Sequence, residues 1–223
     1  MSRSNQILLR VEDLPKRWYN VVPDLPEPLP PPKDPEEGES RLAVLEKVMI
    51  RTCLEQDSSH ERWIDIPEEV RDLYIQAGRP RPLIRARRLE RILHLPEDGV
   101  RLYYKREDLS LTGSHKVNTA LPQCYYAKKE GFEGVSTETG AGQWGSALAY
   151  ASALNHLRSI VFWVRAAYDW KPGRRALMKL YGAEVHPSPS PLTETGRSIL
   201  EKEPEHPGSV GIAVSEGLEY VRT

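Results

Sequence analysis

The sequence predicts an α/β protein built around a parallel sheet, and three observations bear on its class, its size and the position of its ligand site. From residue 134 onward, short apolar runs alternate with helical patterns, and such β-α-β-α-β order forms parallel sheets. Hydrophobic residues make up 39% of the 223 residues, enough for the core of one large or two small domains. Segments 112–118 and 138–145 bear glycines and precede predicted helices, and ligands of parallel sheets bind at such junctions.

The first part of the chain is expected to hold an arm followed by helices. Residues 1–22 are expected to form a short strand or an extended segment, and residues 23–35 carry proline at seven of thirteen positions, which imposes polyproline-like backbone. A second helix is predicted to begin at Pro67 and to end at Gly78. Before it, from Glu39, one helical stripe of apolar side chains is predicted: Leu42, Leu45, Val48, Met49 and Cys53.

Residues 79–105 combine a rigid proline turn at 79–83, a basic helix over 85–95 and a strand over 100–105. The helix is expected to bury Leu89, Ile92 and Leu93. Its arginines are interpreted as a solvated face, because Glu90 interrupts them. After residue 130 the predicted order is strand 134–137, helix 144–157, strand 159–164, helix 172–181, strand 183–186 and helix 193–203.

Composition narrows the class of function. With 31 basic and 32 acidic residues the net charge is −1, so no global field draws the chain to nucleic acid or to an anionic membrane. No apolar run approaches the roughly 20 residues of a membrane span, no signal peptide is evident, and a cytoplasmic location is expected. Cys53 and Cys124 are expected to be ordinary buried thiols. We expect a small-molecule role without a metal site.

The segment Thr112-Gly-Ser-His-Lys-Val-Asn118 places a lysine at the start of a predicted helix. Ser114 is expected to be the N-cap, with Lys116 at the second helical position and the helix running to about Glu130, closed by Gly131. The positive end of the helix dipole disfavours the ammonium form, which suits a nucleophile that attacks an aldehyde. A capped helix with a solvated lysine is the structural alternative.

The segment from Glu138 to Gly145 supports two functional interpretations. Gly140 to Gly145 matches G-x-G-x-x-G after a strand and before a helix, with Asp169 further on, which fits an NAD(P)-dependent oxidoreductase. Trp144 counts against this, because its bulk would hinder close approach of a pyrophosphate to the backbone.

The second interpretation is a nest of backbone N–H groups that binds a carboxylate. Glu138 would then transfer protons, while the side chains of Thr139 and Gln143 add hydrogen bonds. Combined with Lys116, this loop supplies the parts of a pyridoxal-phosphate enzyme that acts on an amino acid. A surface glutamate before a glycine-rich turn is the structural alternative.

An ordered series of motifs resembles the β-chain of tryptophan synthase, and more closely its stand-alone second class with the longer N-terminus. The resemblance covers roughly residues 60–220, and Trp144 stands where the first class typically has histidine. Arg81, Leu111 and Gly173 depart from the family pattern. The matching segments are Arg79–Leu83, Lys105–Leu109, Thr112–Gln123, Glu138–Gly145, Lys171–Pro172 with Arg174–Arg175, Gly182–Val185 and Pro187–Ser190.

The resemblance implies a fold-type II pyridoxal-phosphate enzyme, a lyase that joins L-serine and indole into L-tryptophan and releases water. Lys116 would hold the cofactor and remove the α-proton of serine, and His115 would lie beside the cofactor phosphate with Asn118 nearby. Glu138 would protonate the departing hydroxyl and assist the attack by indole. The substrate carboxylate would be bound by Thr139, Gly140, Ala141, Gly142 and Gln143, the last also reaching a cofactor oxygen.

The resemblance also divides the chain into an extended proline-rich arm (1–38), the part of the N-terminal domain with the cofactor lysine (39–130) and a mobile α/β substrate-loop subdomain truncated at its C-terminus (131–223). The family's phosphate-binding loop belongs to a C-terminal domain that is missing from this sequence. We therefore expect a homo-oligomer or a complementary C-terminal chain as partner. The alternative is an inactive truncated or split-subunit chain.

The two functional interpretations of the glycine loop predict different ligands. If the loop clamps an amino-acid carboxylate, calorimetric titration with NAD or NADP shows no binding. Binding of either nucleotide at micromolar concentration, about −8 kcal/mol, would instead favour the oxidoreductase.

Overall fold

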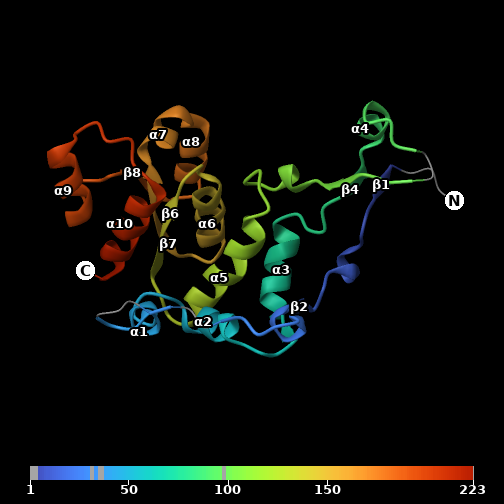
Figure 1. The fold of residues 1–223 in the computed structure, drawn as a ribbon, viewed down its shortest axis with the longest axis horizontal. Coiled ribbons are helices and arrows are strands. Elements are labelled where there is room, and N and C mark those ends of the chain that lie inside the picture. The colour runs from blue at the N-terminus through green and yellow to red at the C-terminus, as the bar shows by residue number, and fades with distance from the viewer. Residues whose placement is uncertain (1–4, 31–32, 35–37, 97–98, 223) are drawn as a thin grey trace.

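The computed structural model describes residues 5–30, 33–34, 38–96 and 99–222. Within these residues the second half of the chain forms a parallel sheet in the order β6-β7-β8 (Figure 1). Its strands are β6 (Gly134–Thr139), β7 (Arg158–Val164) and β8 (Glu184–Ser188). Ser136 pairs with Ile160 and Phe162 with His186, both in parallel register. The predicted parallel α/β class is confirmed.

Helices cover both faces of this sheet. Successive side chains of β7 point to opposite faces, and they are apolar on both faces, so both faces must be covered. Val161 and Trp163 pack on one face with Ala149 and Met178, while Ile160 and Phe162 pack on the other with Ala213. The first face carries α6 (Gln143–Leu154) and α8 (Pro172–Leu180), and the second carries α10 (Val210–Arg222). Two further helices, α7 (Arg165–Trp170) and α9 (Glu194–Lys202), complete this half.

A second core joins the lysine helix to the sheet layers. Helix α5 (Val117–Lys129) packs between α3 (Glu68–Gln76) and α6. Small and aliphatic side chains of α5, among them Ala120, Leu121 and Cys124, are fully buried against α6. Helix α5 ends as predicted, because Gly131 at φ +87° lets the Phe132 amide donate back to the Ala127 carbonyl.

The N-terminal segments form short antiparallel pairs. Strand β4 (Leu83–Arg85) pairs with both β1 (Gln6–Ile7) and β5 (Tyr103–Lys105), and β2 (Arg17–Tyr19) pairs with β3 (Trp63–Asp65). Three short 3₁₀ turns lie among the described segments: η1 (Val11–Asp13), η2 (Val22–Asp24) and η3 (Glu107–Leu109). The β1–β4 pair and α4 (Arg87–Ile92) extend away from the sheet layers (Figure 1).

Two predictions about the first half are wrong. The stripe from Glu39 forms two helices, α1 (Arg41–Leu45) and α2 (Arg51–Asp57), because the Glu130 carboxylate accepts hydrogen bonds from the Arg51 and Thr52 amides and starts a new helix there. Glu130 lies far along the chain, so the local pattern could not reveal this cap.

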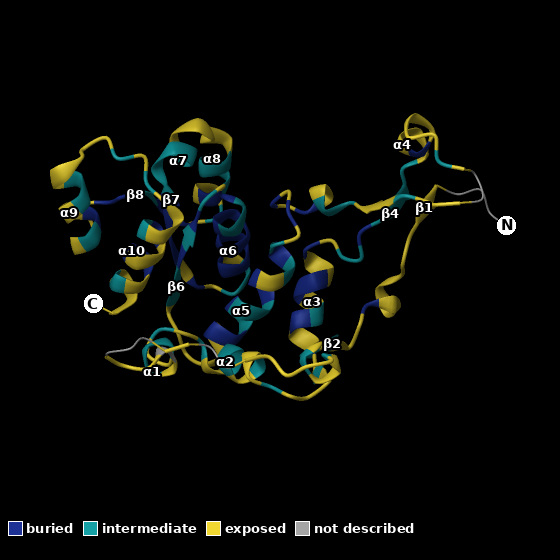
Figure 2. Ribbon diagram, in the orientation of Figure 1, coloured by how far each residue is buried: buried dark blue, intermediate teal, exposed yellow. Residues whose placement is uncertain are grey.

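The basic helix over 85–95 is also shorter than predicted, and its apolar face is exposed. Leu89, Ile92 and Leu93 are 47%, 63% and 53% exposed, and Figure 2 shows much of α4 in the colour of exposed residues. Glu90 is buried instead, because it accepts hydrogen bonds from the Arg85 guanidinium at 3.0 Å and from the Leu102 amide at 2.8 Å.

Other expectations have mixed outcomes. Residues 25–30 of the proline-rich arm form neither helix nor strand, whereas 31–32 and 35–37 lie outside the described residues. Cys124 is buried as predicted, whereas Cys53 is only half-buried. Burial raises the pKa of Cys53 to about 11 and that of Cys124 to about 12, so both free thiols stay protonated at neutral pH. No helix in the described part of the chain has the length and apolar composition of a membrane span.

The fully buried Glu216 connects α10 to the segment after β8, and its removal should destabilise the fold. Its carboxyl oxygens accept hydrogen bonds from the Ser188 hydroxyl, from the Ser190 amide at 2.7 Å and from the Thr193 hydroxyl at 2.8 Å. Glu216→Ala leaves these buried donors unpaired, and we expect a loss of about 3 kcal/mol in the free energy of unfolding, measured by urea denaturation.

The matched control is Glu201→Ala, at an exposed position of α9. It should change the unfolding free energy by no more than about 0.5 kcal/mol. Equal effects of the two substitutions would contradict a structural role for Glu216.

Candidate functional site

The two predicted loops lie at the same edge of the fold because of the way α5, β6 and α6 are connected. Strand β6 packs against both helices and is joined to each by a short loop, so both helices run antiparallel to it. Helices α5 and α6 therefore run in the same direction, side by side (Figure 1). Their N-termini, with Lys116 and Gly142, are placed at the carboxyl edge of the sheet, where ligands of such folds bind.

A group of buried hydroxyls shapes the turn before α5 and delays the start of the helix. The Ser110 hydroxyl accepts a hydrogen bond from the Ser114 amide and donates one to the Ser114 carbonyl, both at 2.8 Å. The Ser114 hydroxyl accepts from the Lys116 amide at 3.2 Å. Because these local bonds compete with helical ones, α5 begins at Val117. Lys116 is therefore the N-cap residue, and the prediction that Ser114 is the N-cap is wrong.

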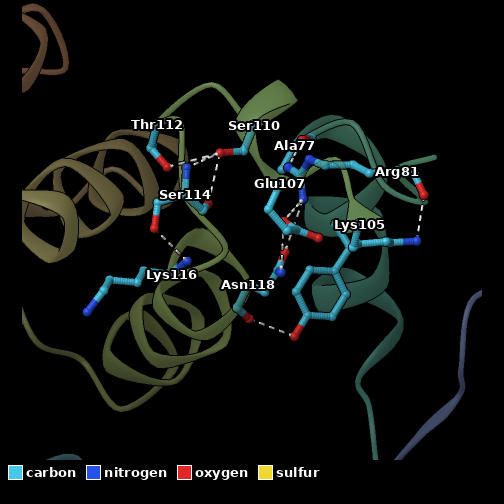
Figure 3. Close-up of polar contacts among 10 residues, drawn as sticks. Ala77, Arg81, Lys105, Glu107, Ser110, Thr112, Ser114, Lys116 and Asn118 are labelled. Atoms are coloured by element: carbon cyan, nitrogen blue, oxygen red, sulfur yellow. Dashed lines mark hydrogen bonds and ion pairs between the residues drawn. The ribbon is translucent and has the colours of Figure 1, made fainter. Parts of the chain in front are cut away.

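The Lys116 side chain is half-buried and points away from these hydroxyls (Figure 3). Among the described residues, neither its amine nor the exposed His115 ring has a hydrogen-bond partner. An unpaired lysine amine at a helix N-terminus fits a group that forms a covalent bond to an aldehyde. The cofactor roles of Lys116 and His115 stay predictions.

The glycine loop begins where β6 ends and is held closed by Thr139. The buried Thr139 hydroxyl accepts hydrogen bonds from the Gly142 amide at 3.2 Å and the Gly145 amide at 3.3 Å. In the described structure the amides of Ala141, Gln143 and Trp144 have no acceptor. Free amides at a helix N-terminus bind anions, which supports the predicted carboxylate site.

Three residues outside the predicted site contact this loop and hold its backbone. The Trp163 indole donates to the Gly140 carbonyl at 2.9 Å, and the Lys171 ammonium donates to the Ala141 carbonyl at 3.3 Å. Arg174 also lies against the loop, since a Cβ at Gly142 would come within 2.7 Å of its Cδ atom. Lys171 and Arg174 belong to a motif quoted in the sequence analysis, whereas no local signal identified Trp163.

Glu138 is half-buried at the end of β6, beside a large cavity. The Trp144 indole donates to the Thr137 hydroxyl at 2.7 Å, and that hydroxyl donates to the Glu138 carbonyl at 3.2 Å. The cavity has a volume of about 540 Å³, and both Glu138 and Trp144 line it. Most of its remaining wall is apolar and comes from the start of α2 and from α5, β6, α6, β7 and α10, including Ile50, Leu148, Ile160, Val214 and Leu218.

The sequence analysis assigned no role to Arg81 and Glu107, which hold Asn118. The buried Arg81 guanidinium donates to the Glu107 carboxylate at 3.0 Å, and a longer contact of 3.4 Å reaches Asn118 Oδ1 (Figure 3). Burial lowers the pKa of Arg81, and the negative charge of Glu107 opposes this effect. In the sequence Arg81 stands out only as a departure from the family pattern, and Glu107 only as part of a motif.

The fold and the site define an α/β enzyme in which a free lysine amine and an anion-binding glycine loop share the carboxyl edge of a parallel sheet. The chain belongs to the pyridoxal-phosphate dependent enzymes, because that family's sequence model matches residues 74–216. Its cofactor is pyridoxal 5'-phosphate, as the sequence analysis predicted. Membership of this family leaves no support for the oxidoreductase alternative.

Several curated relatives are highly similar. The chain is 55% identical over 96% of its length to the tryptophan synthase beta chain 2 of Methanothermobacter thermautotrophicus, and covers 49% of that protein. It is 53% identical over 96% of its length to the tryptophan synthase beta chain of Pyrococcus horikoshii, covering 46% of it. The chain thus spans about half the length of the curated relatives it matches.

A solved structure, that of a pyridoxal 5'-phosphate-dependent aspartate racemase, aligns with 62% of this chain and 45% of its own. The TM-score is 0.45 and the sequence identity is 24%. This likeness is too distant to bear on function.

Gly142 is the position at which a side chain should disrupt the loop most directly. It has φ +87°, and an added Cβ would overlap Cζ2 of the buried Trp163. We expect Gly142→Ala to lower the free energy of unfolding by about 2–4 kcal/mol, measured by urea denaturation, because it combines backbone strain with overpacking.

Gly173 provides the matched control, because it lies in α8 without a positive φ, and a Cβ added there would meet nothing within 4 Å. Gly173→Ala should leave stability unchanged or raise it by about 0.5 kcal/mol. If Gly142→Ala were tolerated as well as Gly173→Ala, the tight packing of the loop against Trp163 would be refuted.

Proposed function

We propose that this chain supplies the lysine and the substrate loop for formation of L-tryptophan from L-serine and indole. The observation that carries the proposal is the placement of an unpaired lysine amine and a loop with free amides at one edge of the sheet. The relatives, which are tryptophan synthase beta chains, support the choice of reaction. The reaction would be that of a lyase in tryptophan biosynthesis.

Lys116 is the residue that would hold pyridoxal phosphate and move the α-proton of serine. Its amine lies at the N-cap of α5, where nothing competes for it among the described side chains. When bound, the cofactor supplies an electron sink for the charge left on the substrate α-carbon. His115, on the same turn, would lie near the cofactor phosphate, and Asn118 would border the same group.

The glycine loop would bind the serine carboxylate through backbone amides. The N–H groups of Ala141 and Gln143 have no acceptor in the described structure, and Thr139 keeps the loop closed by accepting from the Gly142 and Gly145 amides. Gly140 and Gly142 would contribute their backbone to the carboxylate site, and the Gln143 side chain would reach substrate or cofactor oxygen atoms. This arrangement fixes the substrate before any proton moves.

Glu138 would transfer the proton that converts the serine hydroxyl into water and would then assist the attack by indole. Its half-buried carboxyl borders the apolar cavity of about 540 Å³, whose walls suit a flat aromatic molecule. An acid at the boundary between a polar loop and an apolar cavity can serve both substrates.

The proposed function also includes a partner chain, a cellular location and a moving segment. We propose a homo-oligomer or a complementary chain as partner and a cytoplasmic site of action, with the substrate-loop segment over 131–223 moving during turnover. The relatives' names as tryptophan synthase beta chains and the high proline content of residues 23–35 support this view.

The lysine assignment can be tested chemically. Borohydride reduction of protein loaded with pyridoxal phosphate, followed by peptide mapping, should mark Lys116, because its amine is unpaired in the structure. Lys116→Arg should abolish the label, since a guanidinium forms no stable bond to the aldehyde. A label on Lys105 or Lys171 in place of Lys116 would end the assignment.

Glu138→Gln separates cofactor binding from turnover. The label on Lys116 should persist, because Glu138 acts on the substrate, while tryptophan formation from serine and indole should fall at least about 100-fold. Turnover is measured by the appearance of tryptophan with cofactor in excess. Unchanged turnover in Glu138→Gln would remove Glu138 from the catalytic set.

A further inference from the structure

The Arg81 guanidinium is a buried cation that joins three separate segments. Arg81 is only 3% exposed, and its Nη2 atom donates to the Ala77 carbonyl, at the end of α3, at 2.7 Å. Its Nη1 atom donates to the Glu107 carboxylate of η3 at 3.0 Å and lies 3.4 Å from Asn118 Oδ1, in the first turn of α5 (Figure 3). One side chain therefore connects α3, η3 and α5.

Asn118 is fixed by more than this one contact. The Asn118 side-chain nitrogen lies 3.5 Å from the same Glu107 oxygen that accepts from Arg81. The Tyr74 hydroxyl donates to the main-chain carbonyl of Asn118 at 2.9 Å. The oxygen of the Asn118 side-chain amide thus faces Arg81, and its nitrogen faces Glu107. Asn118 comes two residues after Lys116, so the network constrains the turn that carries the lysine amine.

We infer that Arg81 is a positioning residue that fixes the first turn of α5 through Asn118 and Glu107 and so holds Lys116 in place for the cofactor. This inference rests on the function proposed for Lys116. Arginine suits the role because its planar fork can bond acceptors in different directions at once, whereas a lysine ammonium cannot reproduce that geometry. The Lys105 ammonium, which donates to the Arg81 carbonyl at 2.5 Å, anchors the main chain of Arg81 as well.

The Arg85–Glu90 pair is a matched control within the same chain. Its guanidinium and carboxylate are also largely buried, with side chains 15% and 10% exposed and a 3.0 Å contact. It ties β4 to α4 and to the Leu102 amide, in the part of the chain that extends away from α5 (Figure 1). Loss of this pair should lower stability without disturbing the lysine turn.

The experiment compares Arg81→Lys with Arg85→Lys in the full chain. Amide hydrogen exchange over residues 112–120 should accelerate in Arg81→Lys and stay at the wild-type rate in Arg85→Lys. The dissociation constant for pyridoxal phosphate, measured by absorbance titration, should rise about tenfold in Arg81→Lys alone. The absorbance maximum of the bound cofactor should shift with it, which a loss of stability by itself does not cause.

Two further variants show whether Arg81 acts through its partners. Glu107→Gln, which loosens the same guanidinium while leaving Arg81 in place, should change exchange and cofactor binding in the same direction. Arg81→Lys added to Asn118→Ala should weaken cofactor binding little beyond Asn118→Ala alone, because the shared contact is already lost. Additive effects of the two substitutions would overturn the proposed route through Asn118.

The outcomes separate this inference from the proposed function. Equal exchange rates over 112–120 in Arg81→Lys and Arg85→Lys would overturn the positioning role, whatever the cofactor does. Failure of wild-type protein to be labelled at Lys116 would overturn the proposed function, and the exchange data, which need no cofactor, would still decide whether Arg81 fixes the turn.

Discussion

The packing of α5 and α6 in the same direction is the constraint on which the site depends. Each helix is tied to β6 by a short loop, so both must run against the strand and present their N-termini at one edge. Fully buried small residues, including Ala120 and Ala147, allow the two helices to lie close together. The lysine and the glycine loop, which are separated in sequence, are therefore placed at the same edge of the sheet.

Buried or capping polar side chains join parts of the chain that the hydrophobic cores alone would not fix. Glu130 starts α2, Glu219 accepts from the Glu194 and Thr195 amides at the start of α9, and Glu216 secures the segment after β8. In each case a carboxylate satisfies backbone donors that a helix or loop leaves unpaired. Arg81 does the converse by donating to a carbonyl and a carboxylate.

Local patterns were sufficient for the sheet β6-β7-β8 and for α6, α8 and α9, but they missed α7 and α10 and were insufficient for much of the first half. The continuous apolar run of β7 and the glycines after α5 and α8 indicate the buried sheet and the helix ends within a few residues. By contrast, the break between α1 and α2 depends on Glu130, and the burial of Glu90 depends on Leu102. The site followed the same division: Lys116 and the glycine loop are local motifs, whereas Trp163 and Arg81 contribute through contacts between distant segments.

The fluorescence of Trp163 should depend on the state of the glycine loop. Its indole is fully buried, donates to the Gly140 carbonyl and lies against Gly142, so its surroundings include the backbone proposed to bind the substrate. Indole fluorescence responds to nearby charge and to changes in hydrogen bonding. Trp163 is therefore an intrinsic fluorescent probe next to the loop. Binding of a carboxylate to the loop should change the tryptophan fluorescence of the protein, so no added dye is needed.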